Sequence, residues 1–166
     1  MSSHNSAKSP TRRTDRKFSL LPVCLWVLAA TGYGEAIQMD LEQADSGNFY
    51  LHGQLVAGVD TSMLLDTGSG YVSLSRKTFR QVKRLPGTQY VRDIHGTLAN
   101  GRTLRVPIYR VAELSLGDNC VLRNLEVAVF PGADRDILGL NALRRIQPFT
   151  MQMDPPALIV SHCDQT

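Results

Sequence analysis

One carboxylate stands directly behind an apolar run in residues 63–70 (MLLDTGSG). The apolar residues predict a short strand, and the glycines around Ser69 predict a tight turn after Asp66. Removing an unpaired carboxylate from water is costly, so an acid behind two leucines needs a compensating partner. Asp66 is therefore a candidate catalytic acid or base.

Other catalytic chemistries fit the sequence less well. A dinucleotide-binding turn needs a third glycine where this chain has Ser73, followed by a helix. A serine nucleophile elbow needs Gly-x-Ser-x-Gly, whereas Ser69 has glycine directly on both sides. The histidines do not stand at the spacing of a metal-binding motif, so we expect neither a metal nor another cofactor. They are His4, His52, His95 and His162.

A second apolar element with a glycine, residues 137–141 (ILGLN), follows about seventy residues after Asp66. Between the two motifs stands Asn100-Gly101, a strong hairpin signal. With LDTGS at 65–69 and ANG at 99–101, the sequence resembles the retropepsin-like aspartic proteases. It is most similar to their exported bacterial single-domain branch (clan AA), over roughly residues 49–160.

The resemblance implies a role for each motif. Asp66 would be catalytic, in an active-site turn formed with Thr67, Gly68 and Ser69. The flap and pocket residues would bind substrate: Ala99, Asn100, Gly101 and Ile137. The second motif, Leu138 and Gly139, would pack under the turn. Viral retropepsins carry an acid and an arginine, which pair, where this chain has Gly70 and Leu140.

The single Asp-Thr-Gly motif has a consequence for assembly. In aspartic proteases two carboxylates lie about 3 Å apart and share a proton, one activating a water and the other protonating the substrate carbonyl. The resemblance therefore implies that Asp66 pairs with Asp66 of a second copy across a two-fold axis. We expect an endopeptidase homodimer that acts on extended polypeptides. The alternative is a catalytically inactive peptide-binding or assembly module on the same fold.

The remaining sequence predicts the elements that position these residues. Most segments read as short strands separated by turns, which favours an all-β, closed retropepsin-like (acid protease) fold with one or two short helices. Expected strands cover 49–56, 59–65, 71–74, 89–94, 96–99, 102–116, 121–130, 136–139, 149–153 and 157–160. Ser75 is the expected N-cap of a helix that ends at Val82, and a second helix follows Gly139.

The N-terminal segments predict export. Residues 1–17 form a basic n-region, and residues 18–34 form an apolar signal peptide or signal anchor, too short for the roughly 20 residues of a typical membrane span. Residues 35–47 are expected to be a linker, and residues 48–166 the protease domain. We expect a periplasmic protein, soluble or tethered to the inner membrane through residues 18–34 if these remain uncleaved.

Charge and cysteines add smaller expectations. The net charge of +3 comes from the basic n-region, so we expect no nucleic-acid partner. Five basic residues on the predicted helix are interpreted as a solvated face, with membrane-surface contact as the alternative. They are Arg76, Lys77, Arg80, Lys83 and Arg84. Cys120 and Cys163 either pair or remain two separate thiols.

Overall fold

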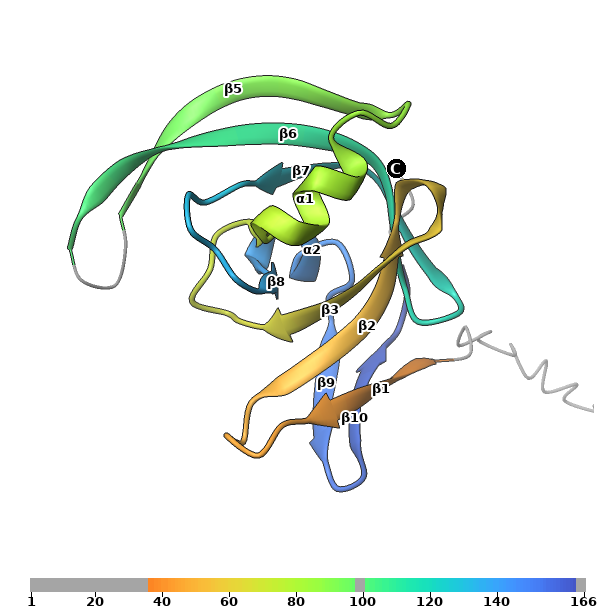
Figure 1. Cartoon of the computed structure of the whole chain (residues 1–166). Helices are drawn as coiled ribbons and strands as arrows, with labels where there is room; N and C mark the ends of the chain where they lie inside the picture. Colours follow the sequence, from red (N-terminus) through yellow and green to blue (C-terminus); the bar gives the residue numbers. More distant parts are fainter. Residues whose placement is uncertain (1–35, 98–100, 164–166) are drawn as a thin grey trace, which may run out of the picture. The chain divides into compact units, whose positions relative to one another are not determined.

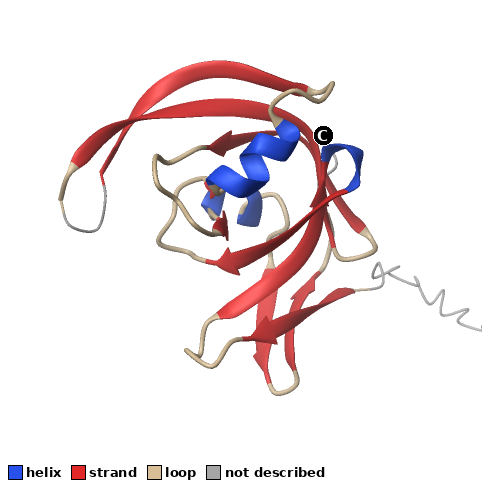
Figure 2. Cartoon of the chain, viewed as in Figure 1, coloured by secondary structure: helices blue, strands red, loops and turns tan. Residues whose placement is uncertain are grey.

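The computed structural model describes residues 36–97 and 101–163, which lie in one compact unit, Tyr33–Thr166. Strands dominate this part of the chain (Figures 1 and 2). The strands are β1 (Ile37–Gln43), β2 (Phe49–Leu55), β3 (Val59–Leu65), β4 (Val72–Ser73), β5 (Thr88–Thr97), β6 (Thr103–Leu116), β7 (Cys120–Ala128), β8 (Asp136–Leu138), β9 (Phe149–Met153) and β10 (Pro156–Val160). The helical segments are η1 (Val56–Gly58), α1 (Arg76–Val82) and α2 (Leu140–Leu143). The all-β prediction is confirmed.

The sheet closes on itself. Its strand order is β5-β6-β7-β4-β8-β3-β2-β1-β10-β9, and a further pairing joins β6 to β2. This closure brings Gly53 opposite Leu116. A Cβ atom on Gly53 would lie 2.4 Å from the backbone oxygen of Ser115, so only glycine allows the two strands to approach this closely.

Alternating apolar side chains of the strands fill the interior of the barrel. Met63, Leu114 and Val127 are fully buried, each on a different strand. α1 packs against β3 and contributes Val82 to the same core. Its start is the predicted one, because the Ser75 hydroxyl oxygen accepts a hydrogen bond from the Thr78 N–H at 3.2 Å.

The first strand corrects a prediction. Residues 35–47 were expected to be a linker, but residues 37–43 form β1, which pairs with both β10 and β2. Met39 and Leu41 are buried. The period-two alternation of apolar residues in IQMDLEQ is the signal for this strand, although polar residues separate them.

β5 and β6 form a long curved hairpin (Figure 1). Two separate strands were expected at 89–94 and 96–99, but β5 runs through Gly96 without a break. A Cβ atom at Gly96 would lie 2.9 Å from Val106 Cγ2 and 3.0 Å from Phe130 Cε1. The glycine at this position therefore serves close packing and not a turn.

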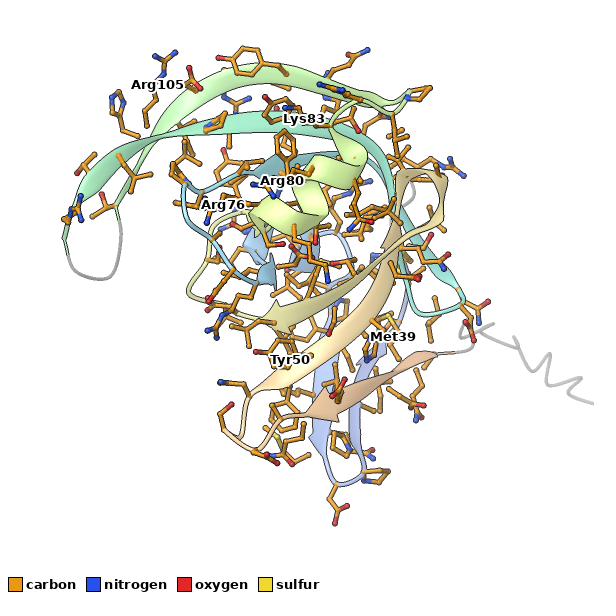
Figure 3. All side chains as sticks on the ribbon, in the orientation of Figure 1. Met39, Tyr50, Arg76, Arg80, Lys83 and Arg105 are labelled. Atoms are coloured by element: carbon orange, nitrogen blue, oxygen red, sulfur yellow. A yellow bond between two sulfur atoms is a disulfide. The ribbon has the colours of Figure 1, made fainter. Side chains whose placement is uncertain are left out.

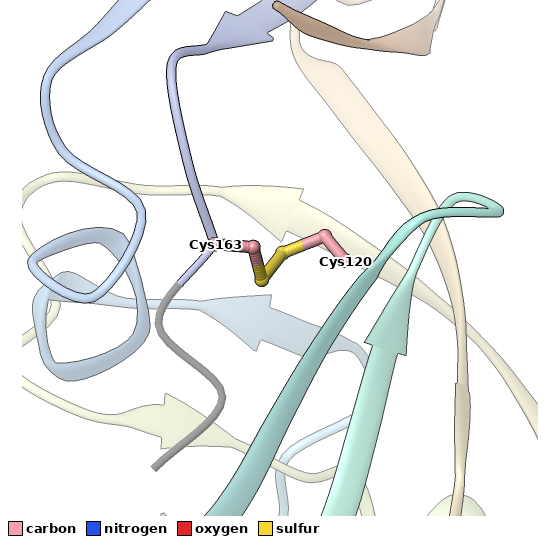
Figure 4. Close-up of a disulfide and its surroundings, with 2 residues drawn as sticks. All are labelled: Cys120 and Cys163. Carbon is pink, nitrogen blue, oxygen red and sulfur yellow. A yellow bond between two sulfur atoms is a disulfide. The ribbon is translucent and has the colours of Figure 1, made fainter. Parts of the chain in front are cut away.

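A disulfide joins Cys120, at the start of β7, to Cys163 beyond β10 (Figure 4). Their Cα atoms lie 5.4 Å apart, and the bond closes a sequence separation of 43 residues. The structure thereby decides between the paired and the separate cysteines. A cross-link over such a separation stabilises a folded domain by about 2–4 kcal/mol.

The predicted signal segment, residues 1–34, lies outside the described residues. Within the described ranges, every helix is too short or too polar to cross a bilayer.

Candidate active site

Asp66 follows directly on β3, in the middle of the sheet. β8 runs parallel to β3, with Leu64 opposite Ile137 and Leu65 opposite Leu138. The Asp66 N–H continues this pairing by donating a hydrogen bond to the Leu138 carbonyl oxygen at 3.2 Å. The position of the acid is therefore set by the second motif through the backbone.

Hydrogen bonds within the turn orient the Asp66 carboxylate. Its Oδ1 accepts a hydrogen bond from the Gly68 N–H at 2.8 Å. A Cβ atom on Gly68 would lie 3.1 Å from the same oxygen, so the glycine leaves room for the carboxylate. The turn is closed by the Ser69 N–H, which donates to the Asp66 carbonyl oxygen at 3.3 Å.

The second motif packs against this turn. The N–H groups of Leu140 and Asn141 donate to the carbonyl oxygens of Ser69 and Gly70, at 2.8 and 3.2 Å. At Gly139 a Cβ atom would lie 2.2 Å from the Tyr71 carbonyl oxygen, so only glycine fits between the two segments. The structure thus brings together two motifs that are about seventy residues apart in the sequence.

A cleft of about 500 Å³ opens beside Asp66. Its walls come from the active-site turn, from the end of β5, from β8 and from the loop before β8. The lining residues are Asp66, Gly68, Ser69, Gly70, Ser73, Thr97, Phe130, Pro131, Gly132, Ala133, Asp134, Arg135 and Ile137.

The cleft collects some of the predicted site residues and leaves others out. Asp66, Gly68, Ser69 and Ile137 line it, whereas Leu138 and Gly139 lie against the Asp66 turn. Thr67 is exposed and is not among its described lining residues. Gly101 has a positive φ of 79° at the hairpin end, whereas Ala99 and Asn100 lie outside the described residues.

Comparison with known proteins places this arrangement in a family. Residues 54–145, which include both motifs, match the family described as gag-polyprotein putative aspartyl protease. The chain belongs to this family. No curated protein matches the sequence.

The fold of this aspartyl protease family member is also found in a solved structure. A crystal structure of a retropepsin-like aspartic protease from Rickettsia conorii superimposes with a TM-score of 0.55 at 18% sequence identity. The match covers 76% of this chain and 90% of the other. The predicted retropepsin-like family and fold are confirmed, while membership of the exported bacterial branch stays a prediction.

Asn141 has a structural role in this retropepsin-like protein that sequence reasoning missed. Its Oδ1 accepts a hydrogen bond from the Val72 N–H at 2.7 Å, and its Nδ2 donates to the Glu126 carbonyl oxygen at 2.7 Å. The carboxamide therefore ties the segment after the turn to β7. It lies next to Gly70 and Leu140, where the viral proteins have an ion pair.

Sequence reasoning also missed an ion pair formed by the side chain of Glu126, whose backbone carbonyl binds Asn141. Both guanidinium Nη atoms of Arg92 contact the Glu126 carboxylate at 2.7 Å, and Nη2 also donates to the Tyr71 hydroxyl at 3.3 Å. These hydrogen bonds from Arg92 lower the pKa of the Glu126 carboxyl below its ordinary value. Tyr71, which follows the active-site turn, is thereby connected to β5 and β7.

The role of Asp136 was missed as well. Asp136 is only 5% exposed, and its carboxylate accepts hydrogen bonds from the Thr61 hydroxyl, the Thr78 hydroxyl and the Ser75 N–H, each at 2.6 Å. These donors come from β3 and from the start of α1. Asp136 therefore fixes α1 to the strands that carry Asp66 and Ile137.

Metal ligands are not gathered in this protease domain as far as the structure describes it. Among residues 36–97 and 101–163, no group of three or more His, Cys, Asp or Glu side chains is arranged to hold a metal ion.

Proposed function

We propose that the protein is an aspartic endopeptidase that hydrolyses peptide bonds in extended polypeptides through an Asp66–Asp66 dyad formed across a homodimer. The observation that carries the proposal is the Asp66 carboxylate in the wall of a cleft, held at the end of a central strand by the second motif. The membership of an aspartyl protease family supports this assignment.

The hydrogen bonding of Asp66 leaves one of its carboxylate oxygens available to react. Within the described residues its Oδ1 has one donor, the Gly68 N–H, and its Oδ2 has none. A carboxylate with spare lone pairs in a cleft accepts a proton from water more readily than one that is fully hydrogen-bonded. A second Asp66 from a partner copy would supply the shared proton of the dyad.

The reaction then follows from the two carboxylates. One accepts a proton from a water molecule, whose oxygen attacks the carbonyl carbon of the scissile peptide bond. The other donates its proton to the carbonyl oxygen, which gives a neutral tetrahedral intermediate. When the C–N bond breaks, the leaving nitrogen takes a proton from one carboxyl group, and a hydroxyl of the intermediate returns a proton to the other carboxylate. The carboxylic acid product forms, and the dyad again holds its single shared proton.

The cleft has features that suit an extended peptide. Ile137 and Phe130 form apolar parts of its wall, and Thr97 lines it from the β5–β6 hairpin. Backbone groups near the end of such a hairpin can add β-type hydrogen bonds to an extended substrate. Closure of the hairpin would also exclude water from the reacting groups.

Substitution of the acid tests the proposal. We expect Asp66→Asn to lower kcat/KM for an unfolded polypeptide by at least about 1,000-fold, because an amide cannot act as a general base. Asp118→Asn is the matched control, since Asp118 lies exposed in the turn between β6 and β7. Equal cleavage by the wild type and Asp66→Asn would refute a catalytic Asp66.

The dimer is tested separately by dilution. Specific activity should fall in parallel with the dimer fraction measured by analytical ultracentrifugation. Full activity from a monomer would exclude the shared dyad. Specific binding of peptides without cleavage by the wild type would support the alternative, a peptide-binding module.

We also propose that the protease works outside the cytoplasm, in the periplasm, after export directed by residues 1–34. The disulfide between Cys120 and Cys163 supports this location, because such bonds persist in oxidising compartments. N-terminal sequencing of the protein recovered from a periplasmic fraction would test both the export and the cleavage of residues 18–34. Recovery of the protein only from the cytoplasm would contradict the proposed export.

A further inference from the structure

The exposed face of α1 and the turn after it carries an unusual density of positive charge, hereafter the basic face. It consists of Arg76, Lys77, Arg80, Lys83 and Arg84, all exposed. Figure 3 shows Arg76 and Arg80 on α1, and Lys83 directly after it, at the surface of the molecule. Residues 75–84 include no acidic residue, and within the described chain none of the five cations forms an ion pair.

One end of the basic face adjoins the active-site cleft. A second hollow of about 230 Å³ is lined by Arg76, Lys77 and Arg80 together with Ser75, Ala133 and Asp134. Ala133 and Asp134 also line the cleft that holds Asp66. The two hollows therefore share a wall, and a polypeptide that leaves the cleft past Ala133 enters the hollow with the three cations.

The acidic groups nearby leave this positive charge largely uncompensated. The Asp134 carboxylate is 82% exposed and lies 3.4 Å from Arg135 Nε, its own neighbour in the sequence. Asp136 is buried and accepts hydrogen bonds from Thr61, Thr78 and Ser75. A carboxylate brought into this hollow by a bound polypeptide would thus meet Arg76, Lys77 and Arg80, none of which forms an ion pair within the described chain.

We propose that Arg76, Lys77 and Arg80 form a recognition site for acidic side chains of the substrate, to one side of the scissile bond. The inference rests on the proposed protease function and names its substrate class: polypeptides with Asp or Glu flanking the cleaved bond. Charges at the rim of a binding site act mainly on association and on discrimination between substrates. We therefore expect the three cations to lower KM for acidic substrates more than they change kcat.

The test uses a series of otherwise identical peptides in which Glu, Gln or Lys occupies each position in turn around the cleavage site. At low salt we expect kcat/KM to be about 10-fold higher for Glu than for Gln at one or two positions on one side, mostly through KM. The preference should fade as the salt concentration rises, because exposed charges are screened.

Two matched double variants locate the effect. Lys77→Gln with Arg80→Gln removes two cations that line the hollow, and should reduce the preference for Glu to about 2-fold. Lys83→Gln with Arg84→Gln removes the same two residue types from the other end of the basic face. Neither residue lines the hollow in the described structure, so the preference should remain. Equal losses in both variants, or in neither, would overturn the proposal.

Two further readouts separate this inference from other outcomes. Cleavage of the Gln peptide by the wild type reports on the proposed protease function alone, because this peptide carries no acidic side chain for the basic face to bind. If the wild type cleaves no peptide, fluorescence anisotropy of a labelled Glu peptide with Asp66→Asn still measures recognition. Loss of binding to phosphatidylglycerol–phosphatidylcholine vesicles in Lys77→Gln with Arg80→Gln, with unchanged peptide preference, would assign the face to a membrane and refute the proposal.

Discussion

Asp66 and Asp136 stand at opposite ends of two neighbouring parallel strands and in opposite surroundings. Asp136 begins β8 opposite Met63, and Asp66 follows β3 just beyond the pairing of Leu65 with Leu138. Asp136 is 5% exposed and accepts three hydrogen bonds, whereas Asp66 lines a cleft and accepts one from within its own described chain. The same side chain thus accepts hydrogen bonds on both oxygens at one site, and at the other keeps one oxygen without a donor from the described residues.

The difference in hydrogen bonding gives the two acids different roles, a structural one for Asp136 and a chemical one for Asp66. A carboxylate whose lone pairs are taken by Thr61, Thr78 and Ser75 holds secondary structure together and has little capacity to move a proton. A carboxylate with a free oxygen in a cleft can serve a reaction. Asp136 thereby supports Asp66 indirectly, because it fixes the start of α1 against β3 and β8.

Breaking the packing that joins the two acid-bearing segments should have the largest effect. Gly139→Ala would place a Cβ atom 2.2 Å from the Tyr71 carbonyl oxygen. Backbone on both sides must then shift, so we expect a loss of about 4 kcal/mol or more in the free energy of unfolding, measured by urea denaturation.

Gly70→Ala is the control for this prediction. In the described structure a Cβ atom on Gly70 meets no other atom within 4 Å, although Gly70 also belongs to the active-site region. We expect a change below about 1 kcal/mol. Similar losses in both variants would mean that close packing at Gly139 does not hold the motifs together.

The comparison between the acids is tested directly by Asp136→Ala and Asp66→Ala. Asp136→Ala leaves two buried hydroxyls and one buried N–H without their acceptor, so we expect a loss of about 3 kcal/mol. Asp66→Ala removes one hydrogen bond at the cleft and should change the free energy of unfolding by less than about 1 kcal/mol. Urea denaturation of both variants measures the difference. Equal destabilisation would contradict the division into a structural and a catalytic acid.

The Asp66 turn was predictable because its signals are local. An apolar strand, an acid and two glycines lie within residues 63–70, and the N-cap at Ser75 likewise depends on Thr78, three residues later. Short-range hydrogen bonding of this kind is encoded in adjacent residues. Resemblance to a known family then related residues 137–141 to the turn.

The role of Asp136 was not predictable from the sequence. Its hydroxyl partners, Thr61 and Thr78, stand 75 and 58 residues away. In the sequence Asp136 reads only as the first residue of a short apolar strand, and no neighbouring residue indicates its donors. The pairing of β8 with β3 and the packing of α1 against β3 bring these donors together.

β1 and Gly96 were misread for a related reason. The apolar residues of β1 are separated by polar ones, so residues 37–43 looked like a linker. Gly96 looked like the first residue of a separate strand, but Val106 and Phe130 pack where its side chain would be. In both cases contacts between distant segments outweighed the local pattern.

Glu126 is a third acid to compare with Asp66 and Asp136, and its substitution should change the stability least. Its carboxylate is paired with Arg92 at the surface, and the hydrogen bonds from Arg92 lower its pKa. Because the pKa is lower in the folded than in the unfolded state, the pair stabilises the fold above the unfolded value of about 4.3, and this contribution is lost as the pH falls through the folded pKa. Glu126→Gln should therefore lower Tm at neutral pH by about 2 °C, and the difference from the wild type should shrink in acid.

Thermal denaturation monitored by circular dichroism, from neutral pH to below the unfolded pKa, measures this difference in Tm. Asp45→Asn, at an exposed residue, is a control whose Tm should follow that of the wild type. A difference in Tm that stays constant down to the lowest pH would show that Glu126 acts through packing and not through its charge.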